Sequence, residues 1–174
     1  MNHRMWKWQQ QKSYINILGN LMFLRALAAF LILPGVVAGI LPLLLAHFDP
    51  WRGHAIIIPG GILIGLGFFL LLWCVRDFYV SGKGTLAPWD PPKHLVVVGL
   101  YRFSRNPMYI SVLTLIGGSA LLAASPLIGA YFLMFCIIFH LRVILYEEPC
   151  LSKMFGQEWT DYCAKVSRWI SIHI

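Results

Sequence analysis

Charged side chains are scarce in this chain. They make up 12% of its 174 residues, while apolar side chains make up 59%; soluble domains have about 25% and roughly 45 to 50% respectively. Acidic residues are the rarest, with 7 Asp and Glu against 14 Lys and Arg. This composition argues against a soluble globular enzyme and favours an integral membrane protein with room for one bundle of helices.

Cysteine and histidine lack the spacings of a metal site or a disulfide framework. The 4 cysteines include no C-x-x-C pair, and none of the 6 histidines has a second metal ligand three or four residues later. Cys74 and Cys136 fall in apolar stretches, while Cys150 and Cys163 fall on the side where we expect reducing conditions. The sequence therefore predicts no metal site and no disulfide.

A phosphate-binding loop for nucleotides is also missing. Residues 80–94, VSGKGTLAPWDPPKH, contain a GKGT run that invites this comparison. The Walker pattern requires a glycine five residues before its final Gly-Lys, and Asp77 stands at that position. Because three prolines exclude regular structure here, we interpret the segment as a long functional loop.

The positions of the basic residues indicate membrane topology rather than nucleic-acid binding. Of the 14 Lys and Arg, only Arg52 falls in the loop after the first apolar stretch, and none falls in the tight turn at 124–127. Lys and Arg accumulate on the cytoplasmic side of membrane proteins. We therefore expect both termini and the loop between the second and third stretches in the cytoplasm, and no nucleic-acid partner.

Four apolar stretches predict four transmembrane helices, since about 20 residues cross the hydrocarbon core. Pro34 and Pro42 are expected to kink or shorten the first helix. In the second, Gly61 and Gly65 form a small-x-x-x-small pair that would let a neighbouring helix approach closely, or are ordinary membrane-helix glycines. The connection between the last two is so short that they must form an antiparallel hairpin. The expected spans are 21–46, 55–75, 109–123 and 127–146.

Segments suited to the membrane surface flank these spans. Residues 1–20 mix Trp, Tyr and Lys, as is typical of the headgroup layer, with simple disorder as the alternative. Residues 151–166 repeat apolar side chains at helical spacing and predict an amphipathic helix that could cover a cytoplasmic pocket. The predicted fold class is an all-α integral membrane protein forming one domain, 1–174, with an N-terminal part, 1–78, and a C-terminal part, 79–174.

Two blocks of sequence concentrate charged and aromatic side chains at the ends of predicted apolar helices. They are GLYRFSRNPMY at 99–109 and EEPCLSKMFGQEWTDY at 147–162. Ionisable groups placed at the end of a membrane helix indicate a functional site by default. Pro107 suits the first position of a helix, where free N–H groups favour an anionic group. The alternative interpretation of the first block is a basic collar anchored by aromatic residues.

Helical periodicity orients the polar residues of the fourth span. His140 and Glu147 are seven residues apart and are expected to point the same way, toward the bundle interior. Glu148 is expected to point about 100° away from Glu147, so one glutamate can face a pocket while the other meets solvent or a cation. Two alternatives stay open: Glu148 as a solvated helix end, and His140 as a buried residue bonded to a neighbouring helix.

The two blocks together carry a resemblance to a known family. From about Gly82 onward, the chain resembles the signature of the isoprenylcysteine carboxyl methyltransferase and phospholipid methyltransferase superfamily. Two blocks in the right order are more specific than either alone. The residues that carry the resemblance are Gly99, Tyr101, Arg102, Arg105, Asn106, Pro107, Met108, Tyr109, Glu147, Glu148, Leu151, Phe155, Gly156, Tyr162, Val166 and Arg168.

The resemblance implies a membrane-embedded enzyme that transfers a methyl group from S-adenosylmethionine, without a soluble Rossmann domain. Glu147 would bind the ammonium group of the cofactor, since a carboxylate complements it. Glu148 or Tyr109 would remove the proton of a thiol or amine acceptor, and Arg142 is the third candidate catalytic residue. By matching positions, the residues expected to bind the cofactor are His94, Leu95, Val96, Gly99, Tyr101, Asn106, Pro107, Met108, Tyr109 and Glu147.

The chain departs from the isoprenylcysteine branch at three positions. Asn106 stands where that branch has His, Val143 stands where its substrate-binding Arg falls, and Ser171 replaces a terminal Pro. Arg142 is adjacent to the position of the missing Arg, but on a helix it points about 100° away. The sequence therefore does not decide whether the acceptor carries a carboxylate, an amine or a thiol.

The function predicted from the sequence is methyl transfer to a lipid-like or small hydrophobic acceptor that arrives from the bilayer. Its active site would face the cytoplasm. Two alternatives belong to other classes: a small membrane reductase that uses NADPH, for which no phosphate cradle is found, and a non-catalytic membrane subunit whose charged helix mouths dock a partner. The oligomeric state is not predicted.

Overall fold

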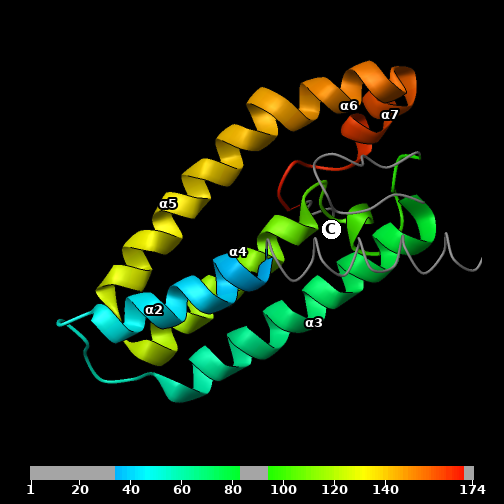
Figure 1. Cartoon of the computed structure of the whole chain (residues 1–174). Helices are drawn as coiled ribbons and strands as arrows, with labels where there is room; N and C mark the ends of the chain where they lie inside the picture. Colours follow the sequence, from blue (N-terminus) through cyan, green and yellow to red (C-terminus); the bar gives the residue numbers. More distant parts are fainter. Residues whose placement is uncertain (1–33, 83–93, 171–174) are drawn as a thin grey trace, which may run out of the picture.

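The computed structural model describes residues 34–82 and 94–170, and within these ranges all regular structure is helical, with no strand (Figure 1). The all-α class predicted from the sequence is confirmed for this part of the chain. In chain order the elements are the π-helix η1 (Val36–Ile40), α2 (Leu41–Phe48), α3 (Ile57–Gly82), the 3-10 helix η2 (Gly99–Arg102), α4 (Pro107–Ala123), α5 (Pro126–Arg142), the π-helix η3 (Val143–Glu147), α6 (Glu148–Phe155) and α7 (Gln157–Lys165).

Within the described ranges, two helical stretches are long and apolar enough to cross a membrane. They are Ile57–Asp77 in α3 and Pro126–Phe155, which joins α5, η3 and α6 without a break. Val36–Phe48 and Pro107–Ala123 are apolar but shorter. The second, third and fourth predicted spans begin within two residues of α3, α4 and α5. The first half of the predicted span 21–46 and all of the predicted surface segment 1–20 lie outside the described residues, as does most of the 80–94 loop.

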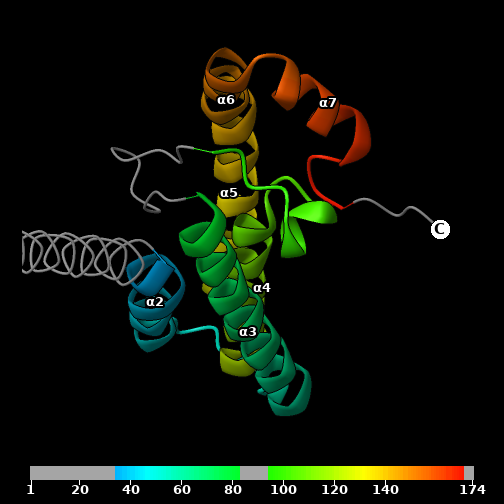
Figure 2. The same cartoon turned by 90° about the vertical axis from the view of Figure 1, so that its right-hand side faces the viewer.

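The helices α3, α4 and α5 lie side by side, and α2 packs beside them (Figures 1 and 2). The predicted hairpin joins α4 to α5 through Ala124, which has a φ of 44°, and Ser125, whose side chain caps α5. Beyond the bundle, α5 continues through η3 into α6. The amphipathic segment predicted at 151–166 is two helices rather than one, because the chain turns at Gly156, where φ is 51°.

The close contact between α3 and α4 depends on glycines other than those predicted. A Cβ atom on Gly60 would lie 2.8 Å from the backbone nitrogen of Leu122, and one on Gly118 would lie 2.9 Å from the backbone nitrogen of Ile64. Cβ atoms on Gly61 or Gly65 would meet nothing within 4 Å. The predicted Gly61 and Gly65 pair is therefore not the surface on which α4 packs, since the adjacent face of α3 makes that contact.

Polar contacts fasten the end of the bundle that carries the hairpin. The buried Asp49, which follows α2, accepts hydrogen bonds from the hydroxyl of Ser125 and from the backbone N–H of Leu127 at 3.1 Å. The N–H of Gly53 donates to the carbonyl of Ala124 at 2.9 Å. The loop between α2 and α3 is thereby attached to the turn between α4 and α5.

The two neighbouring glycines of α3 provide a matched test of this packing. We expect Gly60→Ala to lower the free energy of unfolding by about 1 to 3 kcal/mol, because its methyl group would overlap the backbone of α4. Gly61→Ala should be neutral or stabilising, since alanine favours a helix by about 1 kcal/mol over glycine. Unfolding of the purified protein in detergent measures both, and equal effects would contradict the observed packing.

Candidate functional site

The two charged blocks meet at the end of the bundle opposite the α4–α5 hairpin, where α4 begins and α5 passes into η3. The hydroxyl of Tyr109, in the first turn of α4, donates to Oε1 of Glu147 at the end of η3. Nε of Arg142 donates to the same oxygen at 2.9 Å and to the hydroxyl oxygen of Tyr109 at 3.1 Å. Three side chains that the sequence predicts as site residues therefore form one cluster.

The π-helix η3 explains why Arg142 belongs to this cluster. In a continuous α-helix, residues five apart point about 140° apart. In η3 the N–H of Glu148 instead donates to the carbonyl of Val143, five residues back, and one such turn brings residues five apart nearer to one face. The sequence-based estimate used α-helical spacing throughout and placed Arg142 about 100° from the adjacent position 143, without predicting its contact with Glu147.

His140 lies outside this cluster. Its ring is exposed and stacks on Trp169, with 6.0 Å between ring centroids, and its Nδ1 accepts a bond from Nε1 of Trp169 at 3.3 Å. The predicted common orientation of His140 and Glu147 assumed an uninterrupted α-helix, whereas η3 lies between them. The contacts of His140 are with the C-terminal segment, and those of Glu147 are with Tyr109 and Arg142.

Glu148 is held by two guanidinium groups. Arg168 donates to both of its oxygens, at 2.8 Å each, and Nη1 of Arg105 donates to Oε1 at 2.9 Å. Only 17% of the Glu148 side chain is exposed. Neighbouring positive charges favour the ionised carboxylate, so this arrangement argues against Glu148 as a proton acceptor and against a solvated helix end. The sequence suggested a cation partner but not its identity, because Arg168 lies 20 residues farther along.

The start of α4 presents Asn106, Pro107 and Met108 next to the cluster. Pro107 occupies the first position of the helix, as predicted, and is buried. Asn106 precedes it, but its side chain does not cap the helix; Nδ2 donates instead to the carbonyl of Arg168 at 3.0 Å. Met108 packs against the buried cluster that contains Tyr101.

The segment from His94 to Tyr101 packs against both α3 and α7. Val96 and Tyr101 are buried with Cys74 of α3, and burial raises the pKa of Tyr101 well above its ordinary value. Leu95 packs against the buried face of α7, whereas His94 is exposed. Of the predicted cofactor residues, this segment therefore contributes mainly an apolar wall.

Two contacts that the sequence did not indicate fix the position of η2. The buried carboxylate of Asp77, at the end of the apolar stretch of α3, lies against Gly99, where φ is 56° and an added Cβ would overlap its Oδ2. The hydroxyl of Tyr162, in α7, donates to the carbonyl of Tyr101 at 2.6 Å. The positive φ explains the glycine at position 99, which the resemblance alone assigned to cofactor binding.

Comparisons with known proteins match the part of the chain that contains this cluster. The family model described as phospholipid methyltransferase matches residues 55–158, which is more than half of the chain and includes Tyr109, Arg142 and both glutamates. Two rice proteins, from Oryza sativa subsp. indica and subsp. japonica, are each named probable protein-S-isoprenylcysteine O-methyltransferase and are 33% identical to this chain over 78 residues. That stretch covers 45% of this chain and 41% of each rice protein. The chain belongs to the phospholipid methyltransferase family.

Proposed function

We propose that this protein transfers a methyl group from S-adenosylmethionine to a lipid-like or small hydrophobic acceptor. The observation that carries the proposal is the contact of Tyr109 and Arg142 with Glu147, which unites the two blocks of the family signature in one cluster. The names of the two rice relatives, which specify an O-methyltransferase of a prenylated cysteine, support an apolar acceptor.

The cluster has hydrogen-bonding capacity that suits the amino-acid end of the cofactor. Glu147 uses only Oε1 in its contacts with the described residues, and its side chain is 27% exposed. Among the described residues Arg142 forms hydrogen bonds only through Nε, its guanidinium lies 5.6 Å from the centroid of the Tyr146 ring, and its side chain is 40% exposed. We assign the remaining carboxylate oxygen to the cofactor ammonium and the terminal guanidinium nitrogens to its carboxylate, since charge-assisted bonds of this kind are the strong ones.

The apolar part of the cofactor would lie along the segment that leads to Tyr101. Leu95, Val96 and Met108 offer apolar surface, and exposed His94 lies at its edge. The ring of Tyr109 packs on Phe139 with 4.5 Å between centroids. Aromatic faces attract a sulfonium, so this pair suits the charged centre of the cofactor.

The cofactor, when bound, supplies an electrophilic methyl group on a sulfonium that carries its own leaving group. The residues of the chain therefore need to orient the acceptor and exclude water rather than provide strong acid or base catalysis. Glu148 is committed to Arg105 and Arg168, which leaves the Tyr109 hydroxyl as the candidate to pass on a proton from a thiol or amine. It would give its own proton to Glu147, to which it already donates a hydrogen bond, and take up that of the acceptor. A carboxylate acceptor requires no base.

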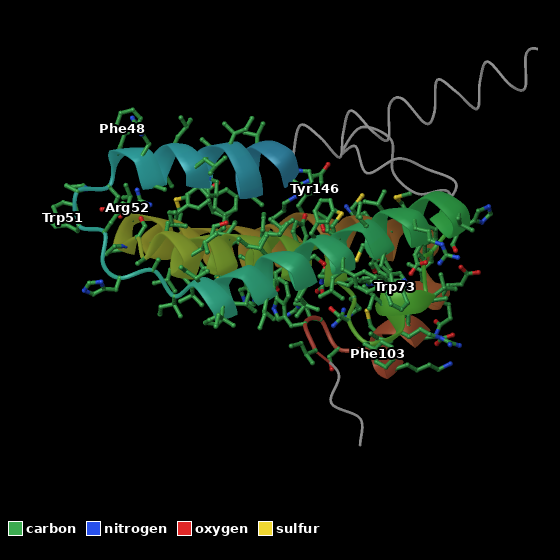
Figure 3. All side chains as sticks on the ribbon, turned by 90° about the horizontal axis from the view of Figure 1, so that it is seen from below. Phe48, Trp51, Arg52, Trp73, Phe103 and Tyr146 are labelled. Atoms are coloured by element: carbon green, nitrogen blue, oxygen red, sulfur yellow. The ribbon has the colours of Figure 1, made fainter. Side chains whose placement is uncertain are left out.

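We propose four membrane spans with both termini and the cluster in the cytoplasm. Figure 3 places Trp51 and Arg52 at one end of the bundle and Trp73 and Phe103 at the other. Only the first of these ends is poor in Lys and Arg. Large apolar side chains are exposed along the outer faces of α3 and α5, for example Ile58 at 76% and Leu133 at 62%, as suits contact with lipid and lateral entry of the acceptor.

Binding of S-adenosylhomocysteine to the detergent-purified protein tests the cofactor assignment. We expect calorimetric titration to show binding that Glu147→Gln weakens by about ten- to a hundredfold, because a hydrogen bond to a charged group contributes about 1.5 to 3 kcal/mol. Tyr109→Phe should weaken it less, because the carboxylate remains.

Glu158→Gln is the matched control, since Glu158 is an exposed glutamate of α7 with no ion pair among the described residues. It should bind the ligand as the wild type does. A wild type that binds NADPH and not S-adenosylhomocysteine would point to a reductase, and one that binds neither would favour a docking subunit.

The proposed topology is tested by labelling cysteines in membrane vesicles. In a variant whose four native cysteines are replaced, a membrane-impermeant maleimide should modify Arg52→Cys only from the outer side. It should modify Lys165→Cys, at an exposed position of α7, only from the cytoplasmic side. Labelling of both positions from one side would contradict the proposed arrangement of spans.

A further inference from the structure

One residue of the C-terminal segment is bonded to both blocks of the candidate site. The backbone carbonyl of Arg168 accepts hydrogen bonds from Nδ2 of Asn106 at 3.0 Å and from Oγ of Ser104 at 3.4 Å. Its guanidinium donates to both oxygens of Glu148 at 2.8 Å. Arg168 therefore spans the gap between the start of α4 and the start of α6.

The neighbours of Arg168 make the same connection. We call residues 167–169 the C-terminal strap. The carbonyl of Ser167 accepts from the N–H of Arg105 at 3.0 Å. Trp169 donates to His140 of α5 and packs against the main apolar core. The strap thus bonds to three consecutive residues, 104–106, while its far end rests on α5.

The strap also decides how Asn106 is presented. This residue precedes α4 with φ −130° and ψ 49°, and its side chain makes no capping bond to the helix. Its N–H donates to Oγ of Ser104, and its Nδ2 donates to the strap. The side-chain carbonyl has no partner among the described residues and remains available to a donor group of a ligand.

Burial makes the connection between Arg168 and Glu148 stronger than a surface ion pair. Exposed fractions are 17% for the Glu148 side chain, 12% for Arg105 and 34% for Arg168. The two bonds from Arg168 are parallel and bidentate, a geometry that a lysine cannot reproduce. Because Glu148 follows Glu147 directly, fixing Glu148 also limits where Glu147 can lie.

We propose that Arg168 is a positioning residue for the cofactor site, which sets the separation of Asn106 and Glu147 without contacting the cofactor itself. The proposal rests on the proposed function, because it assigns those two residues to S-adenosylmethionine. It gives Glu148 the complementary role of anchoring the strap. Small displacements of ligand-binding groups are costly for binding and for catalysis.

The test uses the full chain and S-adenosylhomocysteine, with hydrogen exchange at the Arg105 amide as a second measurement. We expect Arg168→Gln to weaken binding by about tenfold or more and to speed exchange at Arg105, whose N–H is bonded to Ser167. Arg168→Lys, which keeps the charge, should show the same effects more weakly and replaces the Gln variant if that does not fold. Lys165→Gln removes the same charge three residues earlier, from an exposed position, and should change neither measurement.

The contact between Glu148 and Arg168 also leads to a prediction for the double variant. If Glu148 and Arg168 act as one unit, Glu148→Gln combined with Arg168→Gln should weaken binding no more than the worse single variant. Unchanged affinity in folded Arg168→Gln or Arg168→Lys would overturn the proposal. A wild type that does not bind S-adenosylhomocysteine would instead overturn the proposed function, and exchange at Arg105 would then still show whether Arg168 holds the strap.

Discussion

One turn of π-helix determines which side chains can meet at the candidate site. With α-helical geometry through residues 143–147, Arg142 and Glu147 would point about 140° apart. The wider turn instead allows Arg142 to bond to Glu147 and to Tyr109. π-turns occur in helices frequently at functional sites. Here the turn lies between a long apolar helix and a short polar one, where the chain leaves the bundle, and it directs both glutamates that follow.

The adjacent residues Glu147 and Glu148 have different surroundings, and this difference suits them to different roles. Glu148 is compensated by two guanidiniums and is largely buried, so it acts as a fixed point between α4 and the strap. Glu147 has one guanidinium and one hydroxyl on a single oxygen, and its other oxygen has no hydrogen-bond partner in the described part of the chain. A site that must bind a cation needs such incomplete compensation, because a fully paired carboxylate gains little from a new partner.

The sequence predicted the helical class, the hairpin and the meeting of two distant charged blocks, because each depends on composition or on motifs. It did not predict which side of α3 meets α4. That helix is apolar on nearly all sides, so periodicity does not distinguish Gly60 from Gly61. The π-turn has no comparable sequence signal. The partner of Glu148 was missed because Arg168 lies in a segment with no regular structure, where spacing carries no directional information.

Polar contacts at both ends of α4 fix the position of this helix, although the helices that carry the site are apolar on nearly all sides. In lipid, as proposed, apolar side chains gain little by facing one another rather than the bilayer, so apolar packing alone gives weak control over helix rotation. Asp49 fastens the hairpin end of α4 through Ser125, and the strap fastens the other end through Asn106. Between these two ends, the glycine contacts let α3 approach α4 closely. Tyr109 lies within one helical turn of the end that the strap holds, so its position depends most directly on the strap.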